Sequence, residues 1–435
     1  MERTIEVQLL NWKNSANRLP LILQGARQVG KTYSLLKFGK SYYKTVAYFN
    51  FEISRELQGV FMRDLSTSRL LRELSAFTTS AMIPDDTLII FDEIQACERA
   101  LTSLKYFAEE APQYHIVAAG SLLGIALNRE EYSFPVGKVQ ILTMYPLNFE
   151  EFMLAQGKES VVTVIRDCYN NNEFCNLHES FMDEYRKFIG VGGMPQVVNE
   201  FMTSGDYNLI MALQKSIIDA YIADMAKYAS ATETVRIMAA FNSVPSQLAK
   251  ENKKFQYKII KSGARATHYE SAIDWLTASA TVTKCLKITE GRAPLTAFTD
   301  AGSFKIYMVD TGLLCASYGI SPLALQNESG VWQTIKGILA ENYVANTLKG
   351  NGFSPYYWES EGKAELDFVI QNQLGEVIPI EVKSSENVRS KSLQQFITKY
   401  NPAWSLRISA RNFGFENNIR SVPLYAAFCI ENQAF

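Results

Sequence analysis

The sequence lacks several features that would place it in a specialised class. It has no run of about eighteen apolar residues, the length that a membrane-spanning helix needs, and its first six residues, 1–6, lack the apolar core of a signal peptide. It has only 3 histidines, and none has a His or Cys partner at metal-binding spacing. We therefore expect neither a membrane segment nor a zinc site.

An excess charge of one sign and closely spaced cysteines are also missing. The formal net charge is -2, so the overall charge attracts neither nucleic acid nor an anionic membrane, although a local basic patch remains open. The 6 cysteines never occur at CxxC spacing, which is typical of a reducing compartment and predicts a cytoplasmic chain. With 435 residues, 47% hydrophobic and 20% charged, the chain has the composition of an ordinary globular protein with two or three domains.

The most informative stretch is the run GARQVGKT, which lies between an apolar segment, 19–24, and a helical pattern, 33–38. It consists of Gly25, Ala26, Arg27, Gln28, Val29, Gly30, Lys31 and Thr32. This strand–GxxxxGK[ST]–helix arrangement predicts a phosphate-binding P-loop, and a chance Gly-Lys-Thr loop is the alternative. The two glycines permit backbone angles that turn N–H groups inward, and the helix adds its positive end. We expect Lys31 to reach the β- and γ-phosphates of ATP and Thr32 to ligate Mg²⁺.

Two acidic residues follow a strand further along the chain. The runs 45–51 and 87–91 are continuously apolar, which is typical of buried parallel strands, and Asp92 and Glu93 end the second one. After a P-loop, an acid at this place is expected to hold the metal ion through water, and Glu93 is placed to polarise the attacking water. The alternative is that the pair begins a helix as an N-cap and a first-turn acid.

Two further strands complete the predicted sheet. Residues 115–119 form the fourth strand and lead to Ser121, which either senses the γ-phosphate or caps the next helix. Residues 138–144 supply the fifth strand. The sequence therefore predicts an α/β domain with a parallel sheet over residues 1–150.

This region resembles the AAA+-like ATPases that carry an extra catalytic glutamate, and in particular a family of largely uncharacterised bacterial and archaeal ATPases. The resemblance is carried by GARQVGKT and by IIFDEIQ (89–95), AAGSLLG (118–124) and FPVGKVQILTMYPLNFEEF (134–152). It implies a P-loop ATPase with ATP and Mg²⁺ as cofactors. In that family an arginine usually follows the glycine at 137, whereas this chain has Lys138. An arginine finger is therefore not implied there, and Arg129 is either a substitute or a surface charge.

The middle of the chain is predicted to be helical and then to form a winged helix. Residues 151–232 have a helical pattern, interrupted by a Gly-Gly-Met-Pro turn at 192–195 to which we assign a structural role, at most that of a lid hinge. Residues 233–312 resemble a winged helix, with helices expected at 235–241, 245–250 and 269–276 and strands at 282–288 and 303–309. Six basic residues suit DNA phosphates, namely Lys250, Lys253, Lys254, Lys258, Lys261 and Arg265. Glu270 and Asp274 on the third helix oppose such contact, so a protein contact is the alternative.

The last part of the chain, 331–435, contains a second set of acids. Residues two apart in a strand share a face, so Glu381 and Lys383 point the same way, and Asp367 is expected on the neighbouring strand of a hairpin. Two acids beside a lysine can hold a divalent metal and activate water, and Glu341 on a helix could complete the site. This order of residues over 331–420 resembles the PD-(D/E)xK restriction-endonuclease-like fold, although Leu366 stands where that motif has proline. The domain either cuts nucleic acid or serves as a binding module.

Together these patterns predict an α/β protein: a P-loop NTPase domain, a helical lid, a winged helix and a small endonuclease-like domain. The leading hypothesis is a Mg²⁺-dependent ATPase that couples ATP turnover to DNA binding or processing, with ATP, DNA and further copies of the chain as the partners it allows. The alternative is an ATP-dependent switch whose inactive nuclease-like domain recruits a protein. A phosphotransferase would use the same P-loop, but Glu93 is placed for water.

Overall fold

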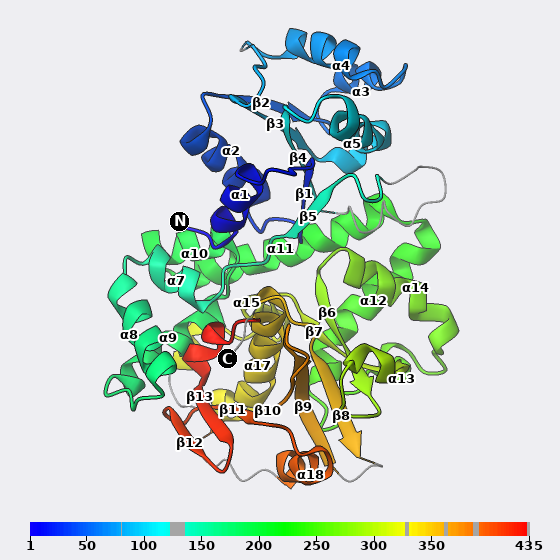
Figure 1. The fold of residues 1–435 in the computed structure, drawn as a ribbon. Coiled ribbons are helices and arrows are strands. Elements are labelled where there is room, and N and C mark those ends of the chain that lie inside the picture. Colours follow the sequence, from blue (N-terminus) through cyan, green and yellow to red (C-terminus); the bar gives the residue numbers. More distant parts are fainter. Residues whose placement is uncertain (80, 122–134, 327–329, 361–363, 386–390, 433–435) are drawn as a thin grey trace. The chain divides into compact units, whose positions relative to one another are not determined.

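The computed structural model describes residues 1–79, 81–121, 135–326, 330–360, 364–385 and 391–432. The chain divides into two compact units, which are described separately below. The N-terminal unit comprises residues 2–145 with 278–280 and is drawn mainly in blue and cyan in Figure 1. The C-terminal unit comprises residues 146–277 and 281–435 together with Met1.

The N-terminal unit is built on five parallel strands. They are β1 (Leu21–Gln24), β2 (Thr45–Asn50), β3 (Thr87–Asp92), β4 (His115–Gly120) and β5 (Gln140–Thr143). Their order in the sheet is β2-β3-β4-β1-β5, and every neighbouring pair is parallel. All five predicted strands are confirmed. Because the sheet is parallel, the loops after β1, β3 and β4 leave from the same edge.

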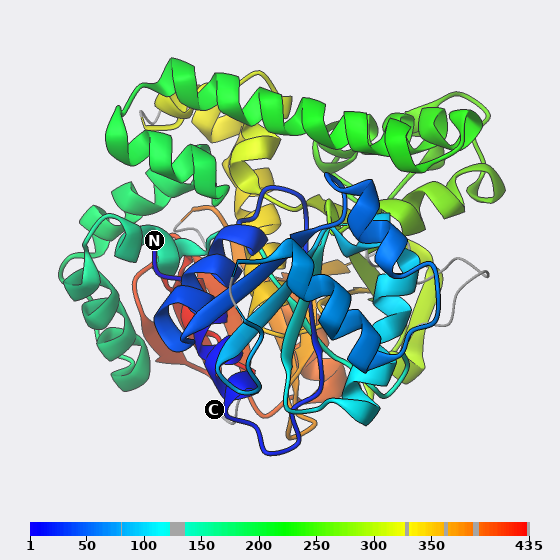
Figure 2. The same cartoon turned by 90° about the horizontal axis from the view of Figure 1, so that it is seen from above.

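Helices cover both faces of this sheet, which explains why its strands are apolar throughout. On one face, α2 (Lys31–Tyr42) packs so closely that a Cβ on Gly39 would lie 2.6 Å from a methyl group of Val46. On the other face, Phe91 belongs to an apolar cluster with Phe107 of α5 (Glu98–Glu110). Figure 2 shows these helices from above, together with α1 (Ile5–Lys13).

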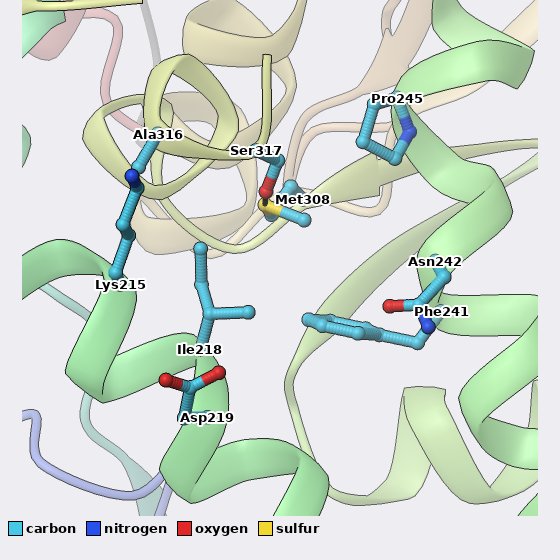
Figure 3. A pocket seen from close by; sticks show the side chains of 9 residues that line it. All are labelled: Lys215, Ile218, Asp219, Phe241, Asn242, Pro245, Met308, Ala316 and Ser317. Carbon is cyan, nitrogen blue, oxygen red and sulfur yellow. Dashed lines mark hydrogen bonds between the residues drawn. The ribbon is translucent and has the colours of Figure 1, made fainter. Parts of the chain in front are cut away.

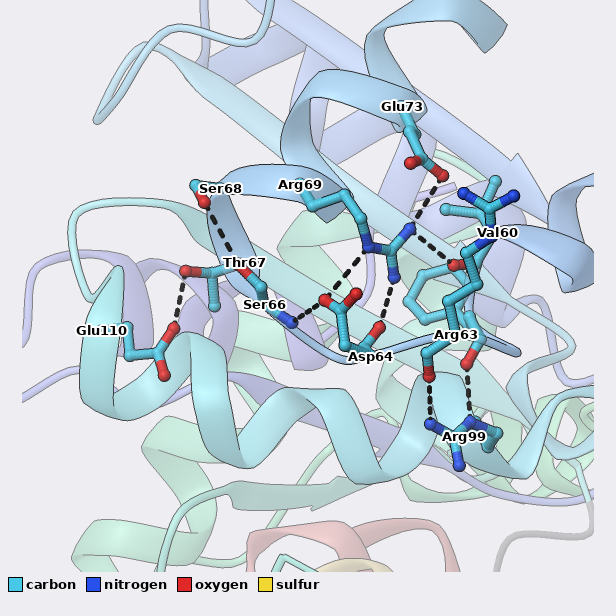
Figure 4. A network of polar contacts seen from close by, with 11 residues as sticks. Val60, Arg63, Asp64, Ser66, Thr67, Ser68, Arg69, Glu73, Arg99 and Glu110 are labelled. Atoms are coloured by element: carbon cyan, nitrogen blue, oxygen red, sulfur yellow. Dashed lines mark hydrogen bonds and ion pairs between the residues drawn. The ribbon is translucent and has the colours of Figure 1, made fainter.

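Two short helices, α3 (Arg55–Val60) and α4 (Thr67–Leu74), lie between β2 and β3. Two arginines fix the turn between them (Figure 4). Arg69 donates to the Val60 carbonyl oxygen at 3.0 Å and forms ion pairs with Asp64 and Glu73, while Arg99 donates to the carbonyl oxygens of Phe61 and Arg63. Both arginines are thus committed to holding backbone carbonyls, so we assign this network a structural role.

The C-terminal unit begins with a helical region, as predicted for 151–232. Its helices are α7 (Phe149–Ala155), α8 (Glu159–Asn171), α9 (His178–Val191), α10 (Pro195–Thr203) and α11 (Tyr207–Tyr228). Gly192, with φ of 78°, makes the turn between α9 and α10, and a Cβ there would lie 2.2 Å from Asp310 Oδ1. Asp310 Oδ2 accepts a hydrogen bond from Gly193 N at 2.6 Å, and its Oδ1 accepts one from Leu313 N at 2.9 Å. This buried carboxylate holds the turn in place, which favours the structural role.

The next region contains α12 (Ala231–Leu248), α13 (Tyr257–Ile260), α14 (Ala266–Ala278) and the antiparallel strands β6 (Val282–Ile288) and β7 (Thr299–Met308). The expected third helix and both strands are confirmed. The prediction of separate helices at 235–241 and 245–250 was wrong, because Pro245 lies inside α12. Proline there is close to the end of the helix, where its missing N–H removes a single hydrogen bond.

One mixed sheet contains these two strands and the later strands that the structure describes. The later strands are β8 (Tyr356–Ser360), β9 (Ala364–Gln371), β10 (Val377–Lys383), β11 (Ser405–Ser409), β12 (Gly414–Glu416) and β13 (Ile419–Pro423). The order is β12-β13-β11-β10-β9-β8-β6-β7, and β6 pairs in parallel with β8. The sheet therefore continues across the predicted boundary between a winged helix (233–312) and an endonuclease-like domain (331–435), and both assignments stay predictions.

In the described part of the chain, α15 (Thr311–Ser317), α16 (Pro322–Gln326) and α17 (Gly330–Gly350) follow β7 in sequence, and α18 (Lys391–Tyr400) follows β10. On α18, Phe396 packs edge-on against Trp358 of β8, with ring centroids 5.3 Å apart. Among the described residues, no helix is both long enough and apolar enough to cross a membrane.

Candidate nucleotide site and acidic centre

The predicted P-loop connects β1 to the first residue of α2. Three of its residues have positive φ, namely Gly25 (147°), Gln28 (65°) and Gly30 (95°). A Cβ on Gly25 would lie 2.1 Å from the Met144 carbonyl oxygen, so only glycine fits beside the end of β5. The loop thus ends at a helix N-terminus, where backbone N–H groups lack intrahelical partners and attract anions.

Lys31, the first residue of α2, is buried within the loop. Its Nζ donates hydrogen bonds to the carbonyl oxygens of Gly25 at 2.9 Å and Ala26 at 2.8 Å. The loop therefore folds around a cation, which places a positive charge where a polyphosphate is expected. Because those carbonyls are neutral, a phosphate oxygen would bind the ammonium more strongly than they do.

The acid predicted to hold the metal ion lies directly beside the P-loop helix. The buried Asp92 Oδ2 accepts hydrogen bonds from Thr32 Oγ1 at 2.9 Å and from the Tyr48 hydroxyl at 2.7 Å. Its Oδ1 accepts one from Glu93 N at 3.1 Å. The structure thus brings Thr32 and Asp92 together as the sequence predicts.

Sequence reasoning missed Tyr48, which lies on the neighbouring strand β2. Burial, and then its hydrogen bond to Asp92, raise the pKa of the Tyr48 hydroxyl to about 12. The hydroxyl therefore keeps its proton, which it donates to Asp92 Oδ2, while its oxygen accepts a hydrogen bond from Asn50 Nδ2 at 3.2 Å. Strand register could have located it, since Asn50 pairs with Asp92 and Tyr48 is two residues earlier on the same face.

Glu93 follows Asp92 in a left-handed conformation, with φ of 50° and ψ of 43°. A non-glycine residue in this region is uncommon, and such strain collects at functional sites. Its Oε2 accepts a hydrogen bond from Gln95 Nε2. The next α-helix, α5, begins only at Glu98, and the short 3₁₀ turn after Glu93 has no side-chain cap. The N-capping alternative for this pair is therefore not what the structure shows.

The remaining predicted residues of this unit are only partly described. Ser121 is buried directly after β4, at the same sheet edge as the P-loop. The helix that it would cap, and Arg129, lie outside the described residues. Lys138, which stands where the family has arginine, forms an ion pair with Glu109 at 3.0 Å.

In the C-terminal unit, the predicted acids meet on the hairpin of β9 and β10. The register pairs Ile380 with Phe368, so Glu381 and Asp367 are neighbours across the two strands, and Val382 N donates to Asp367 Oδ2 at 2.8 Å. Glu381 is buried, and its Oε1 pairs with Lys383 Nζ at 2.6 Å. Burial, and then the charges of Glu341 and Glu381, raise the pKa of Asp367 to about 7. The structure thus brings Asp367, Glu381 and Lys383 together on this hairpin, while Glu341 lies on α17.

Glu341 on α17 is engaged by groups that sequence reasoning did not assign to it. Its carboxylate pairs with Lys253 and with Lys305 Nζ at 3.3 Å, and it accepts a hydrogen bond from the Tyr307 hydroxyl at 2.5 Å. Burial alone would raise the pKa of Glu341, but the two lysines outweigh it and lower the pKa to about 2. Glu341 is therefore ionised, and the charges of Lys253 and Lys305 balance its negative charge.

Lys305 is the most deeply buried charge of this centre, with a side chain 0% exposed. It also pairs with Glu365 Oε1 at 2.5 Å and lies 5.0 Å from the centre of the Tyr357 ring. Burial opposes its charge, but Glu341, Glu365 and Asp367 outweigh burial and raise the pKa of Lys305. The signal in the sequence was a lysine within the apolar strand 303–309, since a buried lysine needs an acid beside it.

The P-loop site and the acidic centre both have oxygen donors that suit a hard divalent cation. At the P-loop, Thr32 Oγ1 and Asp92 Oδ2 lie 2.9 Å apart. In the acidic centre, the buried Oε2 of Glu381 has no hydrogen-bond partner in the described part of the chain. Within that part, no group of three or more His, Cys, Asp or Glu side chains is arranged to hold a metal ion. The oxygen donors at both sites are therefore of the type that binds Mg²⁺. In the acidic centre, however, the third acid, Glu341, forms ion pairs with two lysines.

A separate pocket of about 290 Å³ lies in the C-terminal unit (Figure 3). Its lining comes from α11, α12, the end of β7 and α15, and includes Lys215, Ile218, Asp219, Phe241, Asn242, Pro245, Met308, Ala316 and Ser317. None of the site residues predicted from the sequence lines it, and we assign it no ligand.

Comparison with known families divides the chain into three segments. Residues 17–153 match the family described as AAA domain, which supports an AAA+-like P-loop ATPase for this segment. Residues 182–324 and 336–427 match two domains of unknown function, DUF8612 and DUF4143. No curated protein matches the chain.

Solved structures resemble the chain only distantly. The Walker-type ATPase PABY2304 of Pyrococcus abyssi is 14% identical, with 73% of this chain and 95% of that chain covered and a TM-score of 0.45. The Aeropyrum pernix ORC1 protein in complex with DNA is 10% identical, with 76% and 92% covered and a TM-score of 0.31. The ORC2 protein of the same organism is 11% identical, with 73% and 94% covered and a TM-score of 0.32. Scores this low extend no function to this chain.

Proposed function

We propose that this chain is a Mg²⁺-dependent ATPase that couples ATP turnover to DNA binding or processing. The observation that carries the ATPase assignment is the contact between Thr32 Oγ1 and Asp92 Oδ2, which joins the phosphate loop to the acid at the end of β3. A loop that only bound phosphate would need neither this acid nor Glu93 beside it. The match of residues 17–153 to the AAA domain family supports the same assignment.

Each residue of the site has a distinct task in this proposal. The loop N–H groups and the Lys31 ammonium bind the phosphates, and Thr32 and Asp92 hold the metal ion, with Tyr48 fixing the Asp92 carboxylate. When bound, Mg²⁺ neutralises charge on the β- and γ-phosphates. Glu93 takes a proton from the attacking water, and Ser121 contacts the γ-phosphate from the neighbouring strand β4.

The proposed contact with DNA rests on the basic segment between α12 and α14. Lys258, on α13, and Lys261 are exposed, which leaves their charges available to phosphates. On α14, Asp274 pairs with Lys284 at 3.5 Å, which reduces the repulsion that this acid would exert. The winged-helix assignment of 233–312 remains part of this proposal.

For the acidic centre we propose a metal-dependent nuclease-like site at Asp367, Glu381 and Lys383, supported by Glu341. Asp367 and Glu381 would hold the cation, and Lys383 lies 2.6 Å from Glu381, where it can orient a water or a phosphate.

One observation favours the second candidate, a switch with an inactive domain that recruits a protein. Lys253 and Lys305 already neutralise Glu341, as they would in a purely structural ion network.

Incubation of plasmid and linear DNA with the protein and Mg²⁺ or Mn²⁺ separates these two candidates. We expect slow cleavage by the wild-type protein that Lys383→Ala reduces by about 10²-fold or more, because the transition state loses a positioned cation. Lys391→Ala, which removes an exposed lysine of α18, is the matched control and should cut like the wild type. Absence of cleavage with either metal contradicts the nuclease and favours the switch.

A further inference from the structure

The chain itself provides a cation that occupies the acidic centre. Lys253 pairs with Glu341 Oε2, although the two residues lie 88 positions apart in sequence. Lys253 belongs to the segment 249–256, which has neither helix nor strand, whereas Glu341 lies on α17. This contact joins the basic segment proposed to bind DNA with the acids proposed to bind metal.

The groups that engage Glu341 differ in how firmly they are built into the protein. Lys305 and Tyr307 lie on β7 and are fully buried, so both are fixed by the sheet. The Lys253 side chain keeps 18% of its surface exposed, while that of Glu341 keeps 4%. Lys253 is thus the group that can leave without disturbing the sheet, and Glu341 would still keep two partners.

The segment that carries Lys253 is anchored on its C-terminal side. Phe255 N donates to the Phe304 carbonyl oxygen at 2.8 Å, and the two rings stack with centroids 5.2 Å apart. Gln256 exchanges two hydrogen bonds of 3.0 Å with the Gln247 side chain. These contacts place Lys253 beside β7 and Glu341, while the residues before it, Glu251 and Asn252, are exposed.

We propose that Lys253 is a tethered cation that closes the acidic centre, and that its withdrawal frees Glu341 to support a divalent metal ion. This inference rests on the proposed metal site at Asp367 and Glu381. The buried Oε2 of Glu381, which lacks a hydrogen-bond partner in the described structure, is the independent sign that a cation belongs beside these acids. A phosphate backbone bound to the basic segment would compete with Glu341 for the Lys253 ammonium, so DNA binding would open the centre.

Mn²⁺ binding to the full chain without nucleotide or DNA tests this proposal. The free Mn²⁺ signal in electron paramagnetic resonance reports binding without requiring catalysis. We expect Lys253→Met to bind Mn²⁺ about tenfold more tightly than the wild type, within the usual range of coupling between two sites. Methionine cannot supply an oxygen ligand, so the gain would come from Glu341. Lys391→Met, which removes an exposed charge on α18 of the same unit, should leave the affinity unchanged.

Glu381→Gln in the Lys253→Met background identifies the site that gains affinity, because it should remove the gain while Mn²⁺ at the P-loop is unaffected. Circular dichroism checks that each variant is folded. Equal affinity in the wild type and Lys253→Met, with both weakened by Glu381→Gln, overturns the tethered cation but keeps the metal site. No binding that depends on Glu381 in either background overturns the proposed metal site and the tethered cation together.

Discussion

We expect Lys31→Ala to abolish measurable ATP turnover. The substitution removes the ammonium that lies 2.9 Å and 2.8 Å from two carbonyl oxygens of the P-loop, and with it the charge that meets the phosphates. Loss of one such electrostatic contact typically costs about 10²–10³-fold in turnover, and this one also contributes to binding. Phosphate release from Mg²⁺-ATP at saturating and at low ATP measures the change.

Lys40→Ala is the control for this substitution, because it removes an exposed lysine from the same helix, at the end far from the loop. It should hydrolyse ATP like the wild type. If Lys31→Ala hydrolyses ATP at the wild-type rate, the assignment of the phosphate site is wrong.

Glu93→Gln separates binding from hydrolysis. The amide keeps the size and the left-handed backbone of Glu93 but cannot accept a proton from water, so turnover should fall by about 10²–10⁴-fold. Binding should remain close to that of the wild type, because the phosphates are held by the loop and by Lys31. A fluorescent ATP analogue measures binding, and single-turnover phosphate release measures hydrolysis.

Glu56→Gln provides the matched control, since Glu56 is an exposed glutamate on α3 of the same unit. An equal loss of binding and turnover in Glu93→Gln would instead assign Glu93 to the structure of the loop. The left-handed conformation of Glu93 is a physical reason why a structural role is possible. A non-glycine residue keeps this strained backbone only when the surrounding contacts fix it, so a substitution could disturb the loop.

The N-terminal unit could be predicted from the sequence because its signals are local. The P-loop spacing, the apolar strands and the acids at the end of β3 each lie within about ten residues, and a parallel sheet brings strand ends to one edge. Tyr48 was missed because its role depends on which strands are neighbours. The side-by-side placement of β2 and β3 is a property of the sheet and not of either strand.

The C-terminal unit was harder to predict because its essential contacts are remote in sequence. The spacing of Asp367, Glu381 and Lys383 was enough to place them on one hairpin. The partners of Glu341 come from positions 253, 305 and 307, and no local pattern links them. The continuous sheet also could not be foreseen, since the parallel pairing of β6 with β8 joins segments that the sequence separates by about 70 residues.

The proposed coupling of ATP turnover to DNA binding has a direct consequence for the acidic centre. If the basic segment binds DNA, Lys253 has a second partner, and ATP turnover can be coupled to the opening of Glu341. Without such binding, the lysines around Glu341 would remain a structural ion network. The effect of DNA on ATP turnover therefore decides whether DNA binding and ATP hydrolysis are coupled in this chain.

Steady-state ATP hydrolysis with and without duplex DNA, at fixed ionic strength, tests this central claim most directly. We expect DNA to stimulate the wild type several-fold and Lys31→Ala not at all. The double substitution of Lys258→Glu and Lys261→Glu, both at exposed positions, should keep basal turnover and lose the stimulation. ATP turnover that is unchanged by DNA over a range of lengths and concentrations would contradict the coupling of this ATPase to DNA.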